Sequence, residues 1–256
     1  MSVVTLTLRA ALAERLDLDG ILPARTAELS EKDIASLPVS LGGRQRPLGD
    51  LFAIRGERSA HIRFEGDLAA ASRVGAGMAG GRIDVLGSVG DDAGTAMSGG
   101  VLHVSGNAGE RLCAAMPGAS KGMTGGEAVV LGSAGSEAGA RCRRGLIVIC
   151  GDAGPDAARD MIAGTLVVGG RTGAEPGRRS KRGSIVALGG IDVPSTYRYA
   201  CTYEPGFTRL LLLYIRRTHG VAVSDELVAS RFRRYCGDAG EPGKGEILSA
   251  VLSSCP

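Results

Sequence analysis

Between residues 78 and 192, short segments of alternating apolar and polar residues recur six times, each bounded by glycine. The second and fourth residues after the first glycine are apolar in every copy and lie on the same side of an extended chain. This alternation predicts six short β-strands, each with one buried face. The second positions are Ile83, Leu102, Ala128, Ile147, Leu166 and Ile185, and the fourth are Val85, Val104, Val130, Ile149, Val168 and Ala187.

The first glycine of each copy recurs with a fixed period. These anchor glycines are Gly81, Gly100, Gly126, Gly145, Gly164 and Gly183, spaced by 19, 26, 19, 19 and 19 residues, so that one copy carries a seven-residue insertion. A less regular copy starts at Ala60, and a second series of glycines follows the anchors six residues later. We expect these glycines at corners, where the chain needs positive φ angles and close stacking.

A period of 19 residues restricts the architecture. It leaves no room for the helix of a βαβ unit, and the leucine–asparagine signature of a leucine-rich repeat is missing. The remaining fold class is an all-β solenoid, a parallel β-helix of about seven 19-residue coils. Three residues before the anchors lies a series that we expect to fill the interior: Met78, Met97, Met123, Cys142, Met161 and Ser180.

The two ends of the chain differ from the repeat, which indicates three parts. Residues 1–59 are expected to form a small N-terminal cap, 60–193 the β-helix and 194–256 a C-terminal helical cap. In the last part, TRLLLLYIRR predicts a buried helix after Pro205-Gly206. SDELVASRFRRY predicts a second helix, with Ser224 as N-cap and Gly237 as its stop. Both helices are expected to cover the open edge of the last coil.

Composition and charge exclude several classes of protein. The chain has 256 residues, 41 of them glycine, and a formal net charge of +3, which is too balanced to indicate nucleic-acid binding. The longest apolar run, Leu210 to Ile215, is too short for a membrane span. The N-terminus lacks a secretory pattern and the six cysteines lack C-x2-C spacing, so we expect a cytoplasmic protein with reduced thiols.

Candidate catalytic motifs are few. Residues 75–80 match G-x-G-x-x-G, but no helix is predicted after them, so dinucleotide binding is not indicated. His61, His103 and His219 lack metal-ligand spacing, and no Ser–His–Asp set can be assembled from the sequence. We therefore expect no catalytic residue and no metal site in this chain.

Charged residues recur at two corners of the repeat. An acidic column is expected eleven residues after the anchors, at Asp92, Glu137, Asp156 and Glu175, where like charges would repel. A basic corner is expected before the anchors, at Arg141, Arg143, Arg144, Arg178, Arg179, Lys181 and Arg182. Arg178, Arg179 and Arg182 are candidates for docking a protein subunit or a polyanionic ligand. A solvated corner without a specific function is the alternative.

The repeat resembles a known family over nearly the whole chain. It is similar to the C-terminal β-helix of glutamate synthase, and more closely to the C subunit of formylmethanofuran dehydrogenase and of the bacterial formyltransferase/hydrolase complex. The segments that carry the resemblance are LGDLF at 48–52, EGD at 65–67, PGASKGMTGG at 117–126, RRGLIVICGDAG at 143–154, AGTLVVGG at 163–170 and GKGEIL at 243–248. The insertion falls between the same two coils as in that family, and we expect it to form a projecting loop.

The resemblance implies a right-handed β-helix that serves as a scaffold without an active site of its own. It implies partner subunits of amidohydrolase, formyltransferase and dehydrogenase-B-like type, in a complex that uses tetrahydromethanopterin and a methanofuran-type cofactor and releases formate. The excess of arginine over lysine favours the bacterial hydrolase complex. The alternatives are the C subunit of a molybdenum or tungsten dehydrogenase and a glutamate synthase-type domain. A stand-alone β-helix enzyme is disfavoured because no carboxylate cluster lies on a predicted strand face.

Overall fold

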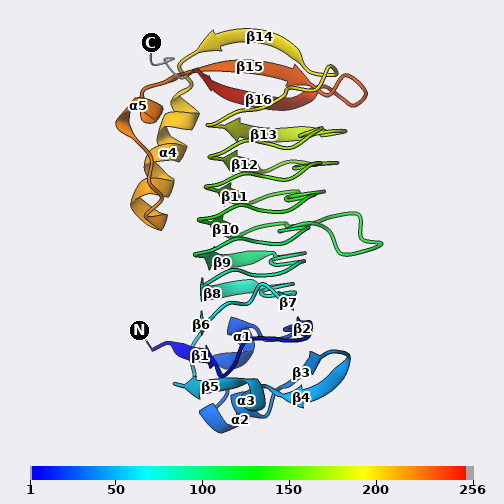
Figure 1. Cartoon of the computed structure of the whole chain (residues 1–256). Helices are drawn as coiled ribbons and strands as arrows, with labels where there is room; N and C mark the ends of the chain where they lie inside the picture. The colour runs from blue at the N-terminus through cyan, green and yellow to red at the C-terminus, as the bar shows by residue number, and fades with distance from the viewer. Residues whose placement is uncertain (1, 252–256) are drawn as a thin grey trace.

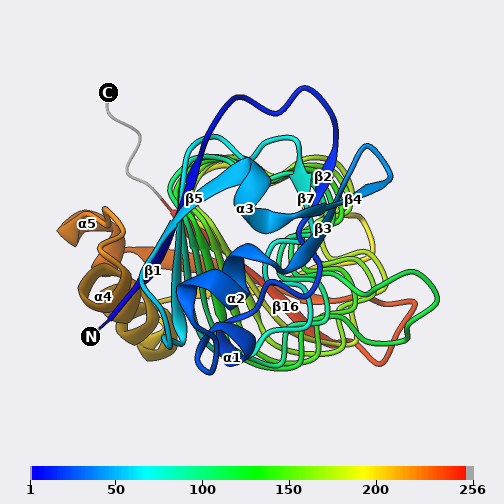
Figure 2. The ribbon, with the colours of Figure 1, turned by 90° about the horizontal axis from the view of Figure 1, so that it is seen from below.

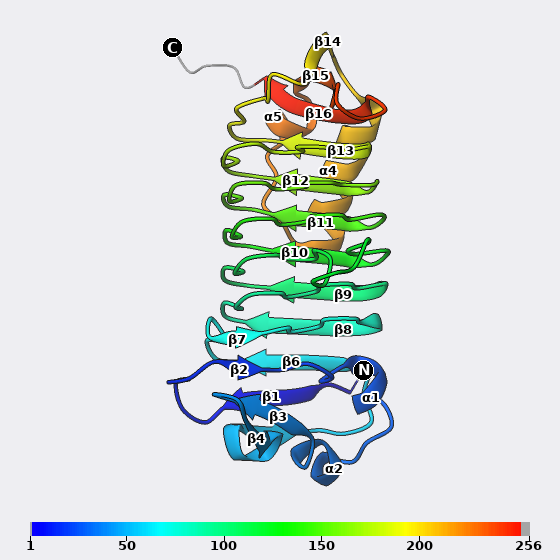
Figure 3. The same ribbon diagram turned by 90° about the vertical axis from the view of Figure 1, so that its right-hand side faces the viewer.

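The computed structural model describes residues 2–251 and is dominated by β-strands that lie one above another along a long axis (Figure 1). The strands of the repeat are short and follow the predicted spacing. They are β6 (His61–Glu65), β8 (Ala79–Leu86), β9 (Gly99–Val104), β10 (Glu127–Val130), β11 (Leu146–Ile149), β12 (Thr165–Val168) and β13 (Arg182–Ala187). Each pairs in parallel with the next, as the side view also shows (Figure 3).

The register between these strands preserves the repeat. Ala128 of β10 lies opposite Leu102 of β9 and Ile147 of β11, so that equivalent positions of neighbouring copies are direct partners. A second row of parallel contacts runs along the stack through isolated bridges that link Leu68, Val89, Ala108, Ala134, Ala153 and Thr172 in turn. The seven-residue insertion lies between β9 and β10 and leaves the stack as a projecting loop (Figure 1), as expected.

The anchor glycines form the predicted column. Gly100 has a φ angle of +82°, and a Cβ atom there would lie 2.7 Å from the carbonyl oxygen of Gly81. The second series of glycines differs, because Gly106 does not have a positive φ angle. A Cβ atom at Gly106 would instead lie 2.8 Å from the carbonyl carbon of Gly87. Of these two series of glycines, only the anchors therefore have the expected positive φ angles, whereas the second series serves close backbone stacking.

The predicted inward positions form the core. The second and fourth residues after each anchor are at most 1% exposed, from Ile83 and Val85 to Ile185 and Ala187. The series from Met78 to Ser180 is also buried and lies at the anchor corner, where the Met97 methyl group would be 2.6 Å from a Cβ atom at Gly126. The narrow interior is thus filled by aliphatic ladders, as the alternation predicted.

The N-terminal segment extends the sheet. β1 (Val4–Leu8) pairs in parallel with β6 and antiparallel with β5 (Phe52–Arg55). Three short helices accompany these strands: α1 (Pro23–Thr26), α2 (Glu31–Ala35) and α3 (Leu48–Leu51). Ser30 begins α2 with a capping box that it shares with Asp33. A second sheet of four strands consists of β2 (Leu16–Asp17), β3 (Pro38–Leu41), β4 (Arg44–Pro47) and β7 (Ala71–Ser72).

The C-terminal segment is less helical than predicted. It contains β14 (Arg198–Tyr203), α4 (Gly206–His219), α5 (Asp225–Val228), β15 (Arg231–Gly237) and β16 (Lys244–Val251). The prediction of a long second helix over 224–235 is wrong beyond Val228, because the chain then enters β15, which pairs antiparallel with both β14 and β16. Gly237 ends a strand and not a helix. Ser224 does cap α5 by accepting a hydrogen bond from the Leu227 amide.

The helix α4 lies beside the stack and not over its end, which corrects the expected position of the helical cap (Figures 1 and 2). Leu212 and Ile215 pack on the outward-facing residues of β10 to β13, which are Val129, Val148, Val167 and Val186. The end of the stack is covered by strands, since β16 pairs in parallel with β13. The large sheet therefore has twelve strands in the order β14-β15-β16-β13-β12-β11-β10-β9-β8-β6-β1-β5. Within residues 2–251, no helix is long and apolar enough to cross a membrane.

Candidate functional site

The candidate arginines at the basic corner lie on β13 and in the turn before it. Arg178 and Arg179 are exposed, but each already binds a carboxylate of the preceding repeat. Arg178 Nη2 lies 2.9 Å from Asp156 Oδ1, and Arg179 Nε lies 2.6 Å from Asp160 Oδ1. The hydrogen bond to Asp160 raises the pKa of Arg179. Arg182, the third candidate, is exposed at the start of β13 and makes no ion pair with any residue in the described range.

Asp160 is the centre of this arrangement. Its carboxylate is only 13% exposed and is approached by three guanidinium groups from three levels of the stack. Besides Arg179, Arg141 Nε and Arg159 Nε each lie 3.7 Å from Asp160 Oδ2. The basic corner and the acidic column therefore form one network, and part of the predicted positive charge is compensated within the chain.

Arginines compensate the charge of the acidic column, in which Glu137, Asp156 and Glu175 follow one another in consecutive copies of the repeat. Arg111 occupies the same repeat position between Asp92 and Glu137, and it donates two hydrogen bonds to the Asp92 carboxylate, at 2.7 and 2.8 Å. Arg159 Nη1 lies 2.9 Å from Glu137 Oε1. Residues at this position adopt left-handed backbone angles, such as φ values of 63° at Asp92 and 57° at Arg111. The sequence spacing placed these residues correctly, but it did not show which side chains meet.

Several cations at the same edge remain available to a ligand. Arg143, Arg144, Lys181 and Arg182 are exposed immediately before β11 or at the start of β13, and none forms an ion pair within the described part of the chain. Lys244 extends the row, because it lies opposite Arg182 in the β13–β16 pairing. The strand β12 separates the two pairs of cations, so their backbones are about 10 Å apart. This spacing suits an extended chain of carboxylates better than a single small anion.

The three histidines gather on the outward face of the sheet without forming a metal site. His61 Nε2 lies 2.7 Å from Asp84 Oδ2, and His219 Nε2 lies 2.7 Å from Glu127 Oε2. Burial lowers the pKa of His103. Burial alone would raise the pKa of Asp84, but hydrogen bonds from Arg82 and His61 hold it below its usual value. No group of three or more metal-binding side chains occurs among residues 2–251.

The thiols and the glycine motifs do not form a catalytic centre. The five cysteines in the described range are free, and Cys113 and Cys142 are buried in the core. Burial raises the pKa of the Cys142 thiol to about 11, which makes it a poor nucleophile. Cys255 lies outside the described residues. The G-x-G-x-x-G match at 75–80 runs directly into β8, so no helix N-terminus is available for a pyrophosphate.

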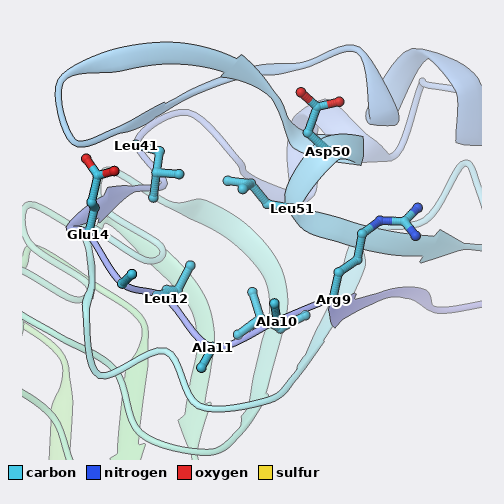
Figure 4. Close-up of a pocket in the computed structure, with 10 residues that line it drawn as sticks. Arg9, Ala10, Ala11, Leu12, Glu14, Leu41, Asp50 and Leu51 are labelled. Atoms are coloured by element: carbon cyan, nitrogen blue, oxygen red, sulfur yellow. The ribbon is translucent and has the colours of Figure 1, made fainter.

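Several open depressions lie on the surface of the described part of the chain. One of about 190 Å³ lies in the N-terminal segment between Ala11, Leu12 and Leu51 (Figure 4). Its charged residues do not converge, because Glu14 lies at one end while Arg9 and Asp50 lie at the other. Arg9 already donates a hydrogen bond to the Gly49 carbonyl oxygen. This depression lacks the converging polar groups of a substrate site.

One exposed surface was missed by the sequence analysis. The helix α4 was expected to be buried, but Phe207, Leu210 and Tyr214 are 49%, 70% and 40% exposed along one side. Their spacing of three and four residues places them in a line opposite Leu212 and Ile215. The signal was present in the sequence, because Phe207 and four consecutive leucines give this helix two apolar faces, of which the sheet can cover only one.

Comparison with known proteins gives three informative matches, although no family model matches the sequence. The chain is 41% identical over 86 residues to the C subunit of the formyltransferase/hydrolase complex of Methylorubrum extorquens. It is 32% identical over 95 residues to the C subunit of molybdenum-containing formylmethanofuran dehydrogenase 1 of Methanosarcina barkeri. These alignments cover 34% and 35% of this chain and 32% of each relative's length.

A solved structure matches over almost the full length. It is one chain of the crystal structure of the formyltransferase/hydrolase complex from Methylorubrum extorquens in complex with methylofuran, with a TM-score of 0.82 and 36% sequence identity. The match covers 97% of the present chain and 100% of that chain. The similarity therefore includes both ends of the stack as well as the repeat.

Proposed function

Because this chain belongs to the family formed by the C subunits of formyltransferase/hydrolase complexes and formylmethanofuran dehydrogenases, we propose that it is a non-catalytic scaffold subunit of a formyltransferase/hydrolase complex. The observation that carries the proposal is the structural match over 97% of the chain at 36% identity. The hydrolase complex is favoured over the dehydrogenase because the identity to the bacterial relative is higher, 41% against 32%.

The proposed reaction takes place on other subunits. A formyltransferase subunit passes the formyl group from formyl-tetrahydromethanopterin to a methanofuran-type cofactor, and an amidohydrolase-type subunit hydrolyses the product to formate. The proposed set of partners also includes a dehydrogenase-B-like subunit, and the cytoplasm is the proposed location.

The proposed architecture of this protein is a right-handed parallel β-helix of about seven coils. The parallel register of β6 to β13, together with the second row of bridges from Leu68 to Thr172, supports it. We propose that residues 60–193 form the β-helix and that residues 1–59 and 194–256 form its N-terminal and C-terminal caps. A stack of this kind presents long, rigid sides on which several subunits can assemble.

The basic corner is proposed to act within this complex. Arg178, Arg179 and Arg182 would hold an acidic face of a partner subunit or, less favourably, the anionic tail of the cofactor. Because Arg178 and Arg179 bind Asp156 and Asp160, the strongest attraction would come from Arg182 and its unpaired neighbours Arg144 and Lys181.

Reconstitution tests the scaffold proposal. We expect the purified chain alone to release no formate from formylated methylofuran, and co-expression with the three other subunit types to give a complex that contains this chain and releases formate. A complex that assembles and is fully active without this chain would contradict a scaffold role. Formate release by the pure chain, lost on substitution of one of its own residues, would contradict a non-catalytic role.

A further inference from the structure

The helix α4 carries an apolar surface that its own chain leaves open. Phe207, Leu210 and Tyr214 form this surface, which we call the α4 stripe. The opposite side of the helix is covered, since Leu212 and Ile215 are fully buried against the valines of the sheet. Leu210 at 70% exposure is the most exposed large apolar residue of the described chain, and the three side chains lie on one rigid helix. Exposed apolar residues that line up in this way mark interaction surfaces.

The side chain of Tyr214 is fixed by two contacts within the chain. Its hydroxyl group donates a hydrogen bond of 2.6 Å to Glu127 Oε1 on β10, and its ring lies edge-on to His219, with 5.7 Å between the ring centroids. The same carboxylate contacts His219 through its other oxygen. A tyrosine fixed by two contacts loses little conformational freedom on binding, which is typical of residues that dominate the binding energy of an interface.

The charge around the α4 stripe indicates the kind of partner. The helix contains three arginines and no acidic residue between Gly206 and His219. Arg216 binds Asp225 at 2.6 Å, whereas Arg209 and Arg217 are exposed beside the stripe. A second copy of the chain would place these arginines against arginines, which is unfavourable. An apolar groove bordered by aspartate or glutamate would match both the stripe and its rim.

We infer that the α4 stripe is a docking site for another subunit of the complex, one that presents an apolar groove bordered by carboxylates. This inference rests on the proposed function, because it needs a hetero-oligomeric complex. It assigns the docking to the side of the stack that carries α4, away from the network around Asp160. The stripe supplies apolar anchors, and Arg209 and Arg217 orient the partner.

Capture of the co-expressed complex tests this inference. The affinity tag is placed on another subunit, and the amount of this chain that is captured is compared for wild type, Leu210→Glu and Leu86→Glu. Leu86 is the matched control, since it is 51% exposed but lies on β8. We expect Leu210→Glu to reduce capture at least tenfold, Leu86→Glu to leave it unchanged, and both variants to unfold at the wild-type temperature. Arg209→Glu combined with Arg217→Glu should also weaken capture, most strongly at low salt.

Other outcomes separate the inference from the scaffold proposal. Capture of Leu210→Glu at the wild-type level overturns it, while formate release by that complex leaves the scaffold proposal standing. Failure to capture even the wild-type chain contradicts the scaffold proposal itself. Dimerisation of the isolated chain, or its binding to vesicles of anionic phospholipid, overturns the inference if Leu210→Glu abolishes it, because the stripe then serves a second copy or a lipid surface. If Leu210→Glu misfolds, Leu210→Ala replaces it, with the same readout and an expected weaker loss.

Discussion

Gly183 of β13 and Gly245 of β16 lie directly opposite each other, although β14, α4, α5 and β15 separate them in the sequence. Gly245 thus occupies the register of an anchor glycine, and Ile247 behind it pairs with Ile185 and is fully buried. The last parallel strand of the stack is therefore supplied by the C-terminal segment. This segment also provides the helix that covers one side of the sheet, so it stabilises the repeat at two surfaces.

The anchor glycines should be sensitive to a single methyl group. Gly100→Ala combines a φ angle of +82° with a Cβ position 2.7 Å from the Gly81 oxygen. We expect the free energy of unfolding to fall by about 1–3 kcal/mol or more, measured by urea denaturation. Gly80→Ala is the control, because its φ angle is not positive and a Cβ atom there meets nothing within 4 Å. Equal effects of the two substitutions would contradict the role assigned to the anchor column.

Truncation of the inward ladder should be costly in the middle of the stack. Ile147 is fully buried between Ala128 and Leu166, so Ile147→Ala removes methyl groups that cannot be replaced by relaxation of the neighbours. We expect a loss of about 2–5 kcal/mol in the free energy of unfolding. Leu131→Ala, at a site 39% exposed, should cost much less. A loss below about 1 kcal/mol for Ile147→Ala would be inconsistent with a tightly packed interior.

The buried thiol of Cys142 should make stability depend on alkaline pH. Burial raises its pKa to about 11, whereas the pKa of the same thiol in the unfolded chain is about 8.5. The contribution of this protonated thiol to the free energy of unfolding is therefore fully present below about pH 8.5. It is lost as the pH rises towards 11, because the thiol releases its proton in the unfolded state before it does so in the folded state. Cys142→Ser should flatten the fall in unfolding free energy between about pH 9 and 10.5, by up to about 1.4 kcal/mol per pH unit. Identical slopes in both proteins would argue against a protonated thiol in the core.

The basic corner is tested by replacing Arg178, Arg179 and Arg182 together with serine. Each exposed ion pair is worth about 0–1 kcal/mol, so a single substitution should change little and the triple variant should have a measurable effect. Assembly with the other subunits and formate production are measured at two salt concentrations, with Arg44→Ser as an exposed control on β4. Lost assembly indicates partner docking, and intact assembly with weaker use of the cofactor indicates tail binding. If neither assembly nor formate production changes, the basic corner is a solvated surface without a specific function.

The repeat could be predicted in detail because its signal is local and periodic. The positions of Ile147 and Ile149 within one short strand, and of Gly145 before it, are repeated with the same spacing in the neighbouring copies. Parallel stacking then fixes which residues meet and which face is buried. The burial of the whole inward series followed directly from this regularity.

The C-terminal strands could not be predicted in the same way. Arg231 to Tyr235 is not part of the periodic repeat, and its hydrogen bonds go to β16, which follows after a short turn, and to β14, which lies before α4. The capping signal at Ser224 was real, but it starts a helix of only four residues. Similarly, spacing alone did not show that Arg179 reaches Asp160 or that Arg111 reaches Asp92, because those contacts depend on side-chain direction at a corner.

The pairing of β16 with β13 has a consequence for the order of events on the ribosome. Until Lys244–Val251 has been synthesised and has left the exit tunnel, β13 has β12 on one side and an open hydrogen-bonding edge on the other. Such an edge is a template for pairing with other chains. The interval between the emergence of β13 and that of β16 is therefore the period in which this edge can pair with other chains.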